Sequence, residues 1–354
     1  MRHVLDIVDL SKEEIETLLK RAEDIIDHPK LYRDACRYKK LATLFYEPST
    51  RTRLSFEAAM LELGGAVIGF EAGTSSSTTK GETVGDTVRT VSQYADVIVM
   101  RHPNDGAPYA AIQRTEVPVI NAGDGGHNHP TQTLADILTI YKKQGRLNDL
   151  TIGLCGDLKY GRTVHSLIRA LIRYNNVRFV CISPKELCLP DYILQLMDEN
   201  NVEYKITDRM EEYMADLDVL YMTRVQQERF DTKAEYERLK DCYILTTDKL
   251  LTAKLTMSIL HPLPRVNEIA CDVDDDPRAA YFDQVAFGKY MRMALILELI
   301  DDAEKGNAAP ERVKILTDKR CDNPRCITCR EDLKPYAVNG KSGLRCYYCE
   351  ALLK

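Results

Sequence analysis

The sequence predicts an α/β protein with two doubly wound parallel-sheet domains, followed by a small C-terminal β module. In each half of the 354 residues, short apolar runs alternate with segments that have helical spacing. Such alternation is typical of a parallel sheet that is covered by helices. The C-terminal module is indicated by the cysteines, because five of the eleven lie in the last 34 residues, beyond a linker at 306–310.

The first half contains four apolar runs that are short enough to be buried strands, at 41–46, 66–70, 97–100 and 117–121. A helix is expected to begin after Ser11, because Glu14 completes a capping box with it. Helical spacing over 54–63 predicts a second helix, which Gly64 and Gly65 end.

The second half repeats this scheme, with apolar runs at 150–156, 178–182, 218–222 and 258–261. Helical patterns lie at 132–143, which joins the halves, and at 164–174 and 290–305. We therefore expect three domains. They are residues 1–131 with a returning helix at 288–305, residues 132–287, and residues 311–354.

Composition and charge argue against several protein classes. A hydrophobic content of 44% and a charged content of 29% are ordinary for a globular chain. No apolar run reaches the roughly 18 residues of a membrane span, and no signal peptide is evident, so we expect a cytoplasmic protein without a membrane partner. The segment 306–354 has ten basic and six acidic residues in a chain of net charge −6, but no basic run there exceeds two residues. Nucleic-acid binding is therefore not expected.

A first candidate site follows the strand at 41–46, where Ser49, Thr50, Arg51 and Thr52 precede a helix. The N-terminus of a helix offers unpaired N–H groups to a phosphate, and hydroxyls and a guanidinium add donors. The alternative is an ordinary helix cap with surface arginines. The segment lacks a nucleotide P-loop pattern, which favours a small phosphorylated substrate over ATP. Arg101, at the end of another strand, could reach the same phosphate.

A second candidate site is the loop 123–132, which has three glycines and two histidines after a strand. His129 could donate to a developing oxyanion, and Gln132 could bind an amide-like group. Metal binding by the histidines is the weaker interpretation, because no carboxylate or thiol has compatible spacing.

Further cations follow strands of the second half. Arg162, Arg224 and Gln226 would suit a substrate with two carboxylates, although each alone could be an ordinary surface residue. Leu263 and Pro264 lie in a proline-rich turn whose carbonyls can point at a ligand. The Ser/Thr run that contains Ser76 and Lys80 is either a solvated loop or a mobile loop that offers hydroxyls and one ammonium to an anion.

The tail has the spacing of a zinc site. Cys321 and Cys326 form one pair and Cys346 and Cys349 another, separated by a hairpin-like segment. Cys329 also forms a two-residue spacing with Cys326, so the choice of ligands stays open. The other six cysteines are scattered and fit reduced cytosolic thiols.

Over residues 1–305 these motifs resemble the catalytic chain of aspartate carbamoyltransferase. The resemblance implies transfer of a carbamoyl group from carbamoyl phosphate to L-aspartate in pyrimidine biosynthesis, in a homotrimer or higher homo-oligomer with shared active sites and without a catalytic cofactor. It implies catalytic roles for Thr52, Lys80, Arg101 and His129. It also implies a wider set of substrate-binding positions: Ser49, Thr50, Arg51, Thr52, Ser76, Lys80, Arg101, His129, Gln132, Arg162, Arg224, Gln226, Leu263 and Pro264.

Two comparisons refine this resemblance. Ornithine carbamoyltransferases have a cysteine where Pro262 stands here, which argues against ornithine. The tail is similar to the zinc domain of the aspartate carbamoyltransferase regulatory chain, and that similarity implies a structural Zn²⁺ bound by Cys321, Cys326, Cys346 and Cys349. Cys329 departs from the pattern, and no room remains for a nucleotide-binding domain ahead of the zinc domain. A non-enzymatic scaffold is the alternative function, although the intact set of arginines favours an enzyme.

Overall fold

The computed structural model describes residues 1–71, 81–225, 232–308, 312–340 and 343–354, without the side chains of 233–235. The chain divides into two compact units. The first unit contains Met1–Thr131 and Lys289–Lys354, and the second contains Gln132–Gly288. Each unit has its own parallel sheet, which confirms the predicted fold class.

The first unit is built on a sheet of order β2-β1-β3-β4, in which all neighbouring strands are parallel. The strands are β1 (Lys40–Phe45), β2 (Ala66–Glu71), β3 (Val97–His102) and β4 (Val119–Asp124). Strands β1, β3 and β4 are buried along nearly their whole length, as apolar runs of a parallel sheet should be. Their carboxyl ends therefore meet at one edge of the sheet.

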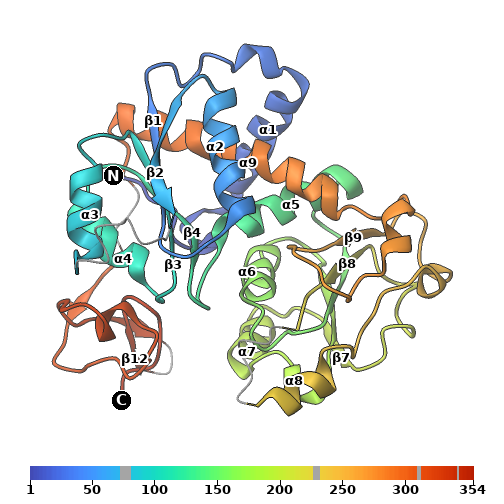
Figure 1. The fold of residues 1–354 in the computed structure, drawn as a ribbon. Helices are drawn as coiled ribbons and strands as arrows, with labels where there is room; N and C mark the ends of the chain where they lie inside the picture. Colours follow the sequence, from blue (N-terminus) through green and yellow to red (C-terminus); the bar gives the residue numbers. More distant parts are fainter. Residues whose placement is uncertain (72–80, 226–231, 309–311, 341–342) are drawn as a thin grey trace. The chain divides into compact units, whose positions relative to one another are not determined.

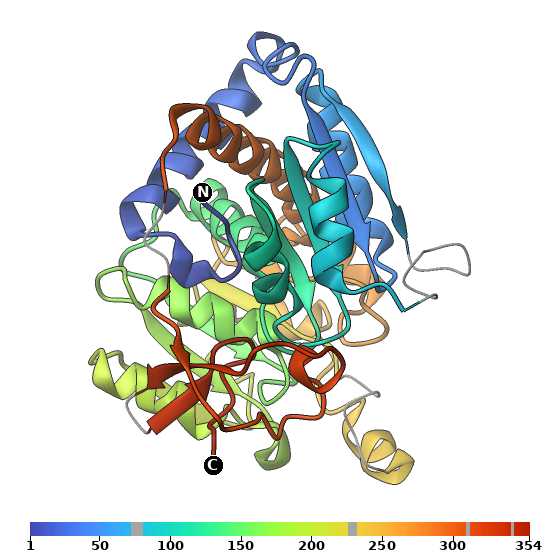
Figure 2. The same ribbon diagram turned by 90° about the vertical axis from the view of Figure 1, so that its left-hand side faces the viewer.

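Helices cover this sheet. They are α1 (Lys12–Asp27), α2 (Thr50–Glu62), α3 (Val84–Val91), α4 (Ala107–Ala111) and the long α9 (Tyr281–Lys305). The predicted capping box of Ser11 and Glu14 is present at the start of α1. Helices α1 and α9 lie against each other (Figures 1 and 2), where Arg21 forms ion pairs with Glu298 and Asp301. Helix α9 begins nine residues before the predicted start at 290.

The second unit has a five-stranded parallel sheet of order β7-β6-β5-β8-β9. Its strands are β5 (Thr151–Cys155), β6 (Arg178–Ile182), β7 (Tyr204–Thr207), β8 (Val219–Met222) and β9 (Ser258–Leu260). Its helices are α5 (Pro130–Gln144), α6 (Arg162–Leu171), α7 (Asp191–Glu199) and α8 (Lys233–Leu239). No helix among the described residues is long and apolar enough to cross a membrane.

The cysteine-rich module follows α9 and is red in Figures 1 and 2. It contains an antiparallel sheet of β10 (Ile315–Leu316), β11 (Tyr336–Gly340) and β12 (Gly343–Cys346). The module belongs to the first unit and shares one hydrophobic core with it, in which Ile327 and Tyr348 lie with Ala107 and Tyr109.

Backbone contacts fix the position of the module. Ile327 N donates to the carbonyl of Asp105 at 3.0 Å, and Asp105 N donates to the carbonyl of Arg325 at 2.9 Å. Gly106 has a φ of +81°, and a Cβ there would lie 2.5 Å from the carbonyl carbon of Tyr348. Only glycine accommodates both this conformation and this close approach. The module is thus built onto the loop that follows β3.

Candidate active site and metal centre

The first group of candidate residues surrounds the N-terminus of α2, directly after β1. Ser49 is the N-cap residue, and its side chain makes no cap hydrogen bond within the described part of the chain. Thr50 and Arg51 are exposed in the first turn, and Thr52 is half-buried. This end of a 13-residue helix presents N–H groups and the positive end of the helix dipole. It can therefore bind an anion, with the hydroxyls as additional donors.

The two arginines of this motif have different environments. Arg53 Nε donates to Glu57 Oε1 at 2.7 Å, and its Nη1 donates to Glu71 Oε2 at 2.9 Å. The pair with Glu71 ties α2 to β2, so Arg53 supports the fold. Arg51 stands in the first turn of α2, where an anion bound at the helix N-terminus would lie.

Arg101 lies at the carboxyl end of β3, where its Cα is in register with Phe45 of β1. Its Nη2 donates to Glu47 Oε1 at 3.1 Å, and its Nη1 donates to the carbonyl of Ala122 at 3.3 Å. The side chain is 12% exposed, and Nε is buried without a hydrogen-bond partner among the described residues. A desolvated cation with an unsatisfied donor is well suited to bind an anionic or strongly polarised oxygen.

The glycine-rich loop after β4 holds His129, whose residue is 5% exposed. Its Nδ1 lies 3.4 Å from the hydroxyl of Thr131. The loop is organised by the buried carboxylate of Asp124, which accepts the N–H of Asn128 at 3.0 Å and contacts His127 Nδ1 at 2.9 Å. His129 is therefore presented by a loop that Asp124 holds from inside.

His127 has a structural role in this loop. Burial disfavours its charged form, but the carboxylates of Asp124 and Glu350 outweigh burial and raise the pKa of His127 well above its usual value. The imidazolium is thus held between two carboxylates. Among the described residues, the group with metal-binding geometry consists of four cysteines and contains no histidine.

In the second unit, two arginines lie at neighbouring strand ends. Arg162 is the first residue of α6, after β5, and Arg224 follows β8. These strands are parallel neighbours, with Cys155 in register with Met222. Both arginines are half-buried, and each guanidinium can bind a carboxylate with two hydrogen bonds.

The proline-rich turn after β9 is held by two buried groups. Leu263 N donates to His261 Nδ1 at 2.8 Å, and His261 Nε2 lies 2.7 Å from Glu268 Oε1. The peptide bond between Leu263 and Pro264 is cis, and Leu263 has a φ of +48°. Burial acts against ionisation of Glu268, but hydrogen bonds from His261 and from backbone N–H groups outweigh it and lower the pKa of Glu268.

Three of the predicted site residues, Ser76, Lys80 and Gln226, lie outside the described residues. The remaining predicted site residues divide between the units. Those that precede Gln132 belong to the first unit, and Gln132, Arg162, Arg224, Leu263 and Pro264 belong to the second.

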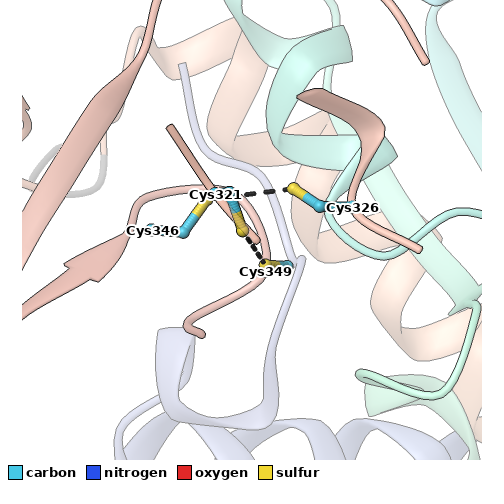
Figure 3. Close-up of side chains that lie close together, drawn as sticks. All are labelled: Cys321, Cys326, Cys346 and Cys349. Carbon is cyan, nitrogen blue, oxygen red and sulfur yellow. Dashed lines mark hydrogen bonds between the residues drawn. The ribbon is translucent and has the colours of Figure 1, made fainter. Parts of the chain in front are cut away.

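The four cysteines of the tail converge on one point, as Figure 3 shows. Their sulfur atoms all lie within 4.8 Å of one another. Cys321 Sγ is 3.5 Å from Cys349 Sγ, and Cys326 Sγ is 3.8 Å from Cys346 Sγ. Four thiolates at about 2.3 Å from a tetrahedral Zn²⁺ would be separated by about 3.8 Å. The donor set and the spacing therefore fit zinc.

Cys329 does not join this group. It is exposed, and its thiol donates toward two carbonyls, those of Cys321 at 3.5 Å and Asn323 at 3.2 Å. The thiol contacts the backbone of the first cysteine loop, whereas the four clustered sulfur atoms contact one another. The geometry thus favours the pair Cys321 and Cys326 over the pair Cys326 and Cys329.

Several supporting residues were not identified from the sequence. Asp124 was part of a predicted loop, but an aspartate between glycines is also ordinary turn chemistry. Asp136, which accepts a hydrogen bond from Gln132 Nε2 at 2.8 Å, could have been found, since the two residues are four apart on a predicted helix. The sequence does not indicate a role for Glu268, because a turn in the folded chain brings its partner His261 to it.

Comparisons with known proteins agree with these features. Residues 2–142 match the family described as aspartate/ornithine carbamoyltransferase, carbamoyl-P binding domain. Residues 148–299 match the aspartate/ornithine carbamoyltransferase, Asp/Orn binding domain. The cysteine-rich module lies beyond both matches.

Similar proteins and structures give the same result. An aspartate carbamoyltransferase catalytic subunit of Lachnoclostridium phytofermentans is 58% identical over 302 residues, which are 85% of this chain and 98% of that protein. One from Clostridium botulinum, strain Okra, is 59% identical over 84% of this chain and 98% of its own length.

Among solved structures, the catalytic subunit of M. jannaschii aspartate transcarbamoylase has a TM-score of 0.81 at 46% identity, and the match covers 86% of this chain and 99% of that one. The aspartate transcarbamoylase of Trypanosoma cruzi, in complex with carbamoyl aspartate and phosphate, has a TM-score of 0.79 at 37% identity, with coverage of 84% and 95%. Because the similarity extends over nearly the full length of these proteins and over both parallel-sheet units, the chain belongs to the aspartate carbamoyltransferase catalytic-subunit family.

Proposed function

We propose that this chain transfers the carbamoyl group of carbamoyl phosphate to the amine of L-aspartate, giving N-carbamoyl-L-aspartate and phosphate for pyrimidine biosynthesis. The observation that carries the proposal is the 58% identity to an aspartate carbamoyltransferase catalytic subunit over 98% of its length. Residues 1–131 with the returning helix 288–305 would bind carbamoyl phosphate, and residues 132–287 would bind aspartate.

The first unit supplies the groups for carbamoyl phosphate. Ser49, Thr50 and Arg51, at the N-terminus of α2, would bind the phosphate. Thr52, Arg101 and His129 would donate to the carbonyl oxygen, on which negative charge develops when the amine attacks. The Nε atom of Arg101 is buried without a hydrogen-bond partner among the described residues. This supports the role, because a desolvated donor stabilises such charge strongly.

The second unit supplies the groups for aspartate and for the carbamoyl NH₂. Arg162, Arg224 and Gln226 would bind the two carboxylates, and Gln132 with the carbonyls of Leu263 and Pro264 would accept from the NH₂ group. The aspartate amine attacks the carbonyl carbon, the C–O bond to phosphate breaks, and the departing phosphate accepts the amine proton. Positioning and electrostatic stabilisation would provide the rate enhancement, and no cofactor is required for catalysis.

Ser76 and Lys80 complete the proposed substrate site. The family resemblance implies that they enter the active site of a neighbouring subunit, in a homotrimer or a higher homo-oligomer. We further propose a cytoplasmic location, with no nucleic-acid or membrane partner.

For the tail we propose a structural Zn²⁺ bound by Cys321, Cys326, Cys346 and Cys349, in a module related to the regulatory-chain zinc domain. The four sulfur atoms lie within 4.8 Å of one another, and four protein ligands would leave no position for a catalytic water. A module of this size buries too little apolar surface to fold stably on its own, and a structural metal compensates for that. Its role would be to dock on the first unit and support subunit assembly.

A product assay tests the proposed reaction. Purified protein is supplied with carbamoyl phosphate and either L-aspartate or L-ornithine, and products are identified by mass spectrometry. We expect N-carbamoyl-L-aspartate in the first reaction and no citrulline in the second. Citrulline formation would contradict the choice of substrate, and no product in either reaction would support a non-catalytic scaffold.

A further inference from the structure

Asp136 is a buried carboxylate of the second unit that has no role in the proposed reaction. It lies on α5, one turn after Gln132, and is 0% exposed. Its Oδ1 accepts from Gln132 Nε2 at 2.8 Å and from Gln284 Nε2 at 2.6 Å. Its Oδ2 accepts from the hydroxyl of Tyr221 at 3.0 Å. These donors provide the compensation that a buried charge requires.

The hydrogen bonds to Asp136 fix the orientation of two amides. An ionised carboxylate can only accept, so Gln132 must turn its NH₂ group toward Asp136 and its Oε1 away from it. Gln284 is fixed at both ends, because its Oε1 accepts the N–H of His261 at 3.0 Å. Rotating either amide by half a turn would place an oxygen against the carboxylate.

The same network reaches the turn that contains Leu263 and Pro264. Gln284 holds the backbone of His261, which is 1% exposed. His261 Nδ1 accepts from Leu263 N, so Nε2 of the neutral ring carries the proton and donates to Glu268. Asp136 therefore lies between two segments to which the proposed reaction assigns acceptors for the carbamoyl NH₂ group.

We propose that Asp136 is a positioning residue for substrate selection. It holds Oε1 of Gln132 toward the carbamoyl NH₂ group and, through Gln284 and His261, fixes the turn at Leu263 and Pro264. The inference rests on the proposed substrate contacts of Gln132 and of this turn. Its consequence is selection of a carbamoyl phosphate over an acyl phosphate with a methyl group in place of NH₂, because a methyl group leaves the acceptors unsatisfied.

The test compares carbamoyl phosphate with acetyl phosphate. KM for carbamoyl phosphate and the inhibition constant of acetyl phosphate are measured at saturating aspartate, for wild type and Asp136→Asn. Asparagine has the same size but offers a donor, so Gln132 is no longer held in one orientation. We expect KM for carbamoyl phosphate to rise about tenfold, as for loss of an oriented hydrogen bond, and the inhibition constant of acetyl phosphate to stay unchanged.

Matched variants separate positioning from folding. Tyr221→Phe removes the donor to Oδ2 of the same carboxylate and leaves both amide contacts intact, so the preference should stay at the wild-type level. Gln132→Met removes the proposed acceptor itself and should lose the preference. Gln284→Met removes the second amide and should reduce the preference. If Asp136→Asn does not fold, Gln284→Met serves as the test variant in its place.

The outcomes are distinguishable. A wild-type preference for carbamoyl phosphate that disappears in Gln132→Met and in Asp136→Asn supports the inference. If Gln132→Met loses the preference while folded Asp136→Asn or Gln284→Met keeps it, the positioning role is overturned and the proposed function stands. If Gln132→Met keeps the preference for carbamoyl phosphate, Gln132 is not the acceptor of the NH₂ group, and the inference is overturned. Wild-type protein without carbamoyl transfer would instead contradict the proposed function.

Discussion

At the residue scale, the charged groups of the first unit divide by their partners. Arg53 and His127 are held by carboxylates that lie on other segments, Glu71 and Glu350. Arg101 also pairs with a carboxylate, that of Glu47, but its Nε atom is buried without a hydrogen-bond partner in the described part of the chain. Groups of the first kind stabilise the fold, and groups of the second kind are suited to bind a substrate oxygen.

Buried neutral histidines give a prediction for stability. Burial lowers the pKa of His102 to about 4, from an ordinary value of 6.5. Because the folded-state pKa is the lower one, the contribution of His102 to stability is present above pH 6.5 and is lost as the pH falls toward 4. The free energy of unfolding should therefore fall less between pH 7 and pH 5 in His102→Asn than in wild type, by about 2 kcal/mol.

The measurement is chemical denaturation of wild type and His102→Asn at both pH values. Asparagine keeps an acceptor for the N–H of Asn104, which His102 Nδ1 accepts at 3.0 Å. The control is His28→Asn, since the side chain of His28 is 58% exposed and pairs with Asp24 at the surface. The same pH dependence in wild type and His102→Asn would show that His102 does not titrate in this way.

At the scale of elements, the strands that contain an apolar run could be predicted, including the edge strand β2, and a strand without such a run could not. Strands β1, β3 and β8 contain short, mostly apolar runs, whose length favours a buried strand over a helix. Strand β7 (Tyr204–Thr207) was not predicted, because it has only four residues and Lys205 interrupts its apolar residues. The position of the module was also not predictable, since it depends on backbone hydrogen bonds of Asp105 with Arg325 and Ile327, which leave no pattern in the side chains.

The candidate site divides in the same way. Ser49, Arg51 and Arg101 could be identified because each follows a recognisable strand. The spacing of Asp136 and Gln132 on a predicted helix could indicate their contact. The contact of Asp136 with Gln284 and that of Glu268 with His261 could not be predicted, because these residues lie on separate segments.

The metal centre gives a prediction for the cysteine-rich module. Cys321→Ser should lose zinc and destabilise the module, whereas Cys329→Ser should keep one zinc per chain, because the Cys329 thiol contacts carbonyls outside the cluster. Metal analysis of purified wild type and both variants makes the comparison, with a control for zinc from the buffer. Zinc retained in Cys321→Ser and lost in Cys329→Ser would contradict the proposed ligand set.

At the scale of the whole molecule, the proposed site requires more than one chain. Mixing impaired Lys80→Ala subunits with impaired Arg51→Ala subunits should raise the activity above that of either variant alone, since some sites would then contain neither defect. The matched control mixes Arg51→Ala with Arg101→Ala, whose defects lie in the same unit of one chain, and it should give no recovery. If properly formed hybrids of Lys80→Ala and Arg51→Ala are no more active than the separate variants, the site is self-contained.

The central claim is that this chain transfers a carbamoyl group at the anion site formed by α2 and Arg101. The direct measurement is kcat/KM for carbamoyl phosphate, at saturating aspartate, in wild type, Arg51→Ala, Arg101→Ala and the exposed-charge control Arg89→Ala. We predict that wild type and Arg89→Ala form N-carbamoyl-L-aspartate equally well. Arg51→Ala and Arg101→Ala should each lose a factor of roughly 10 to 150, since a hydrogen bond to a charged group contributes about 1.5–3 kcal/mol. Wild-type values in both arginine variants would contradict the claim.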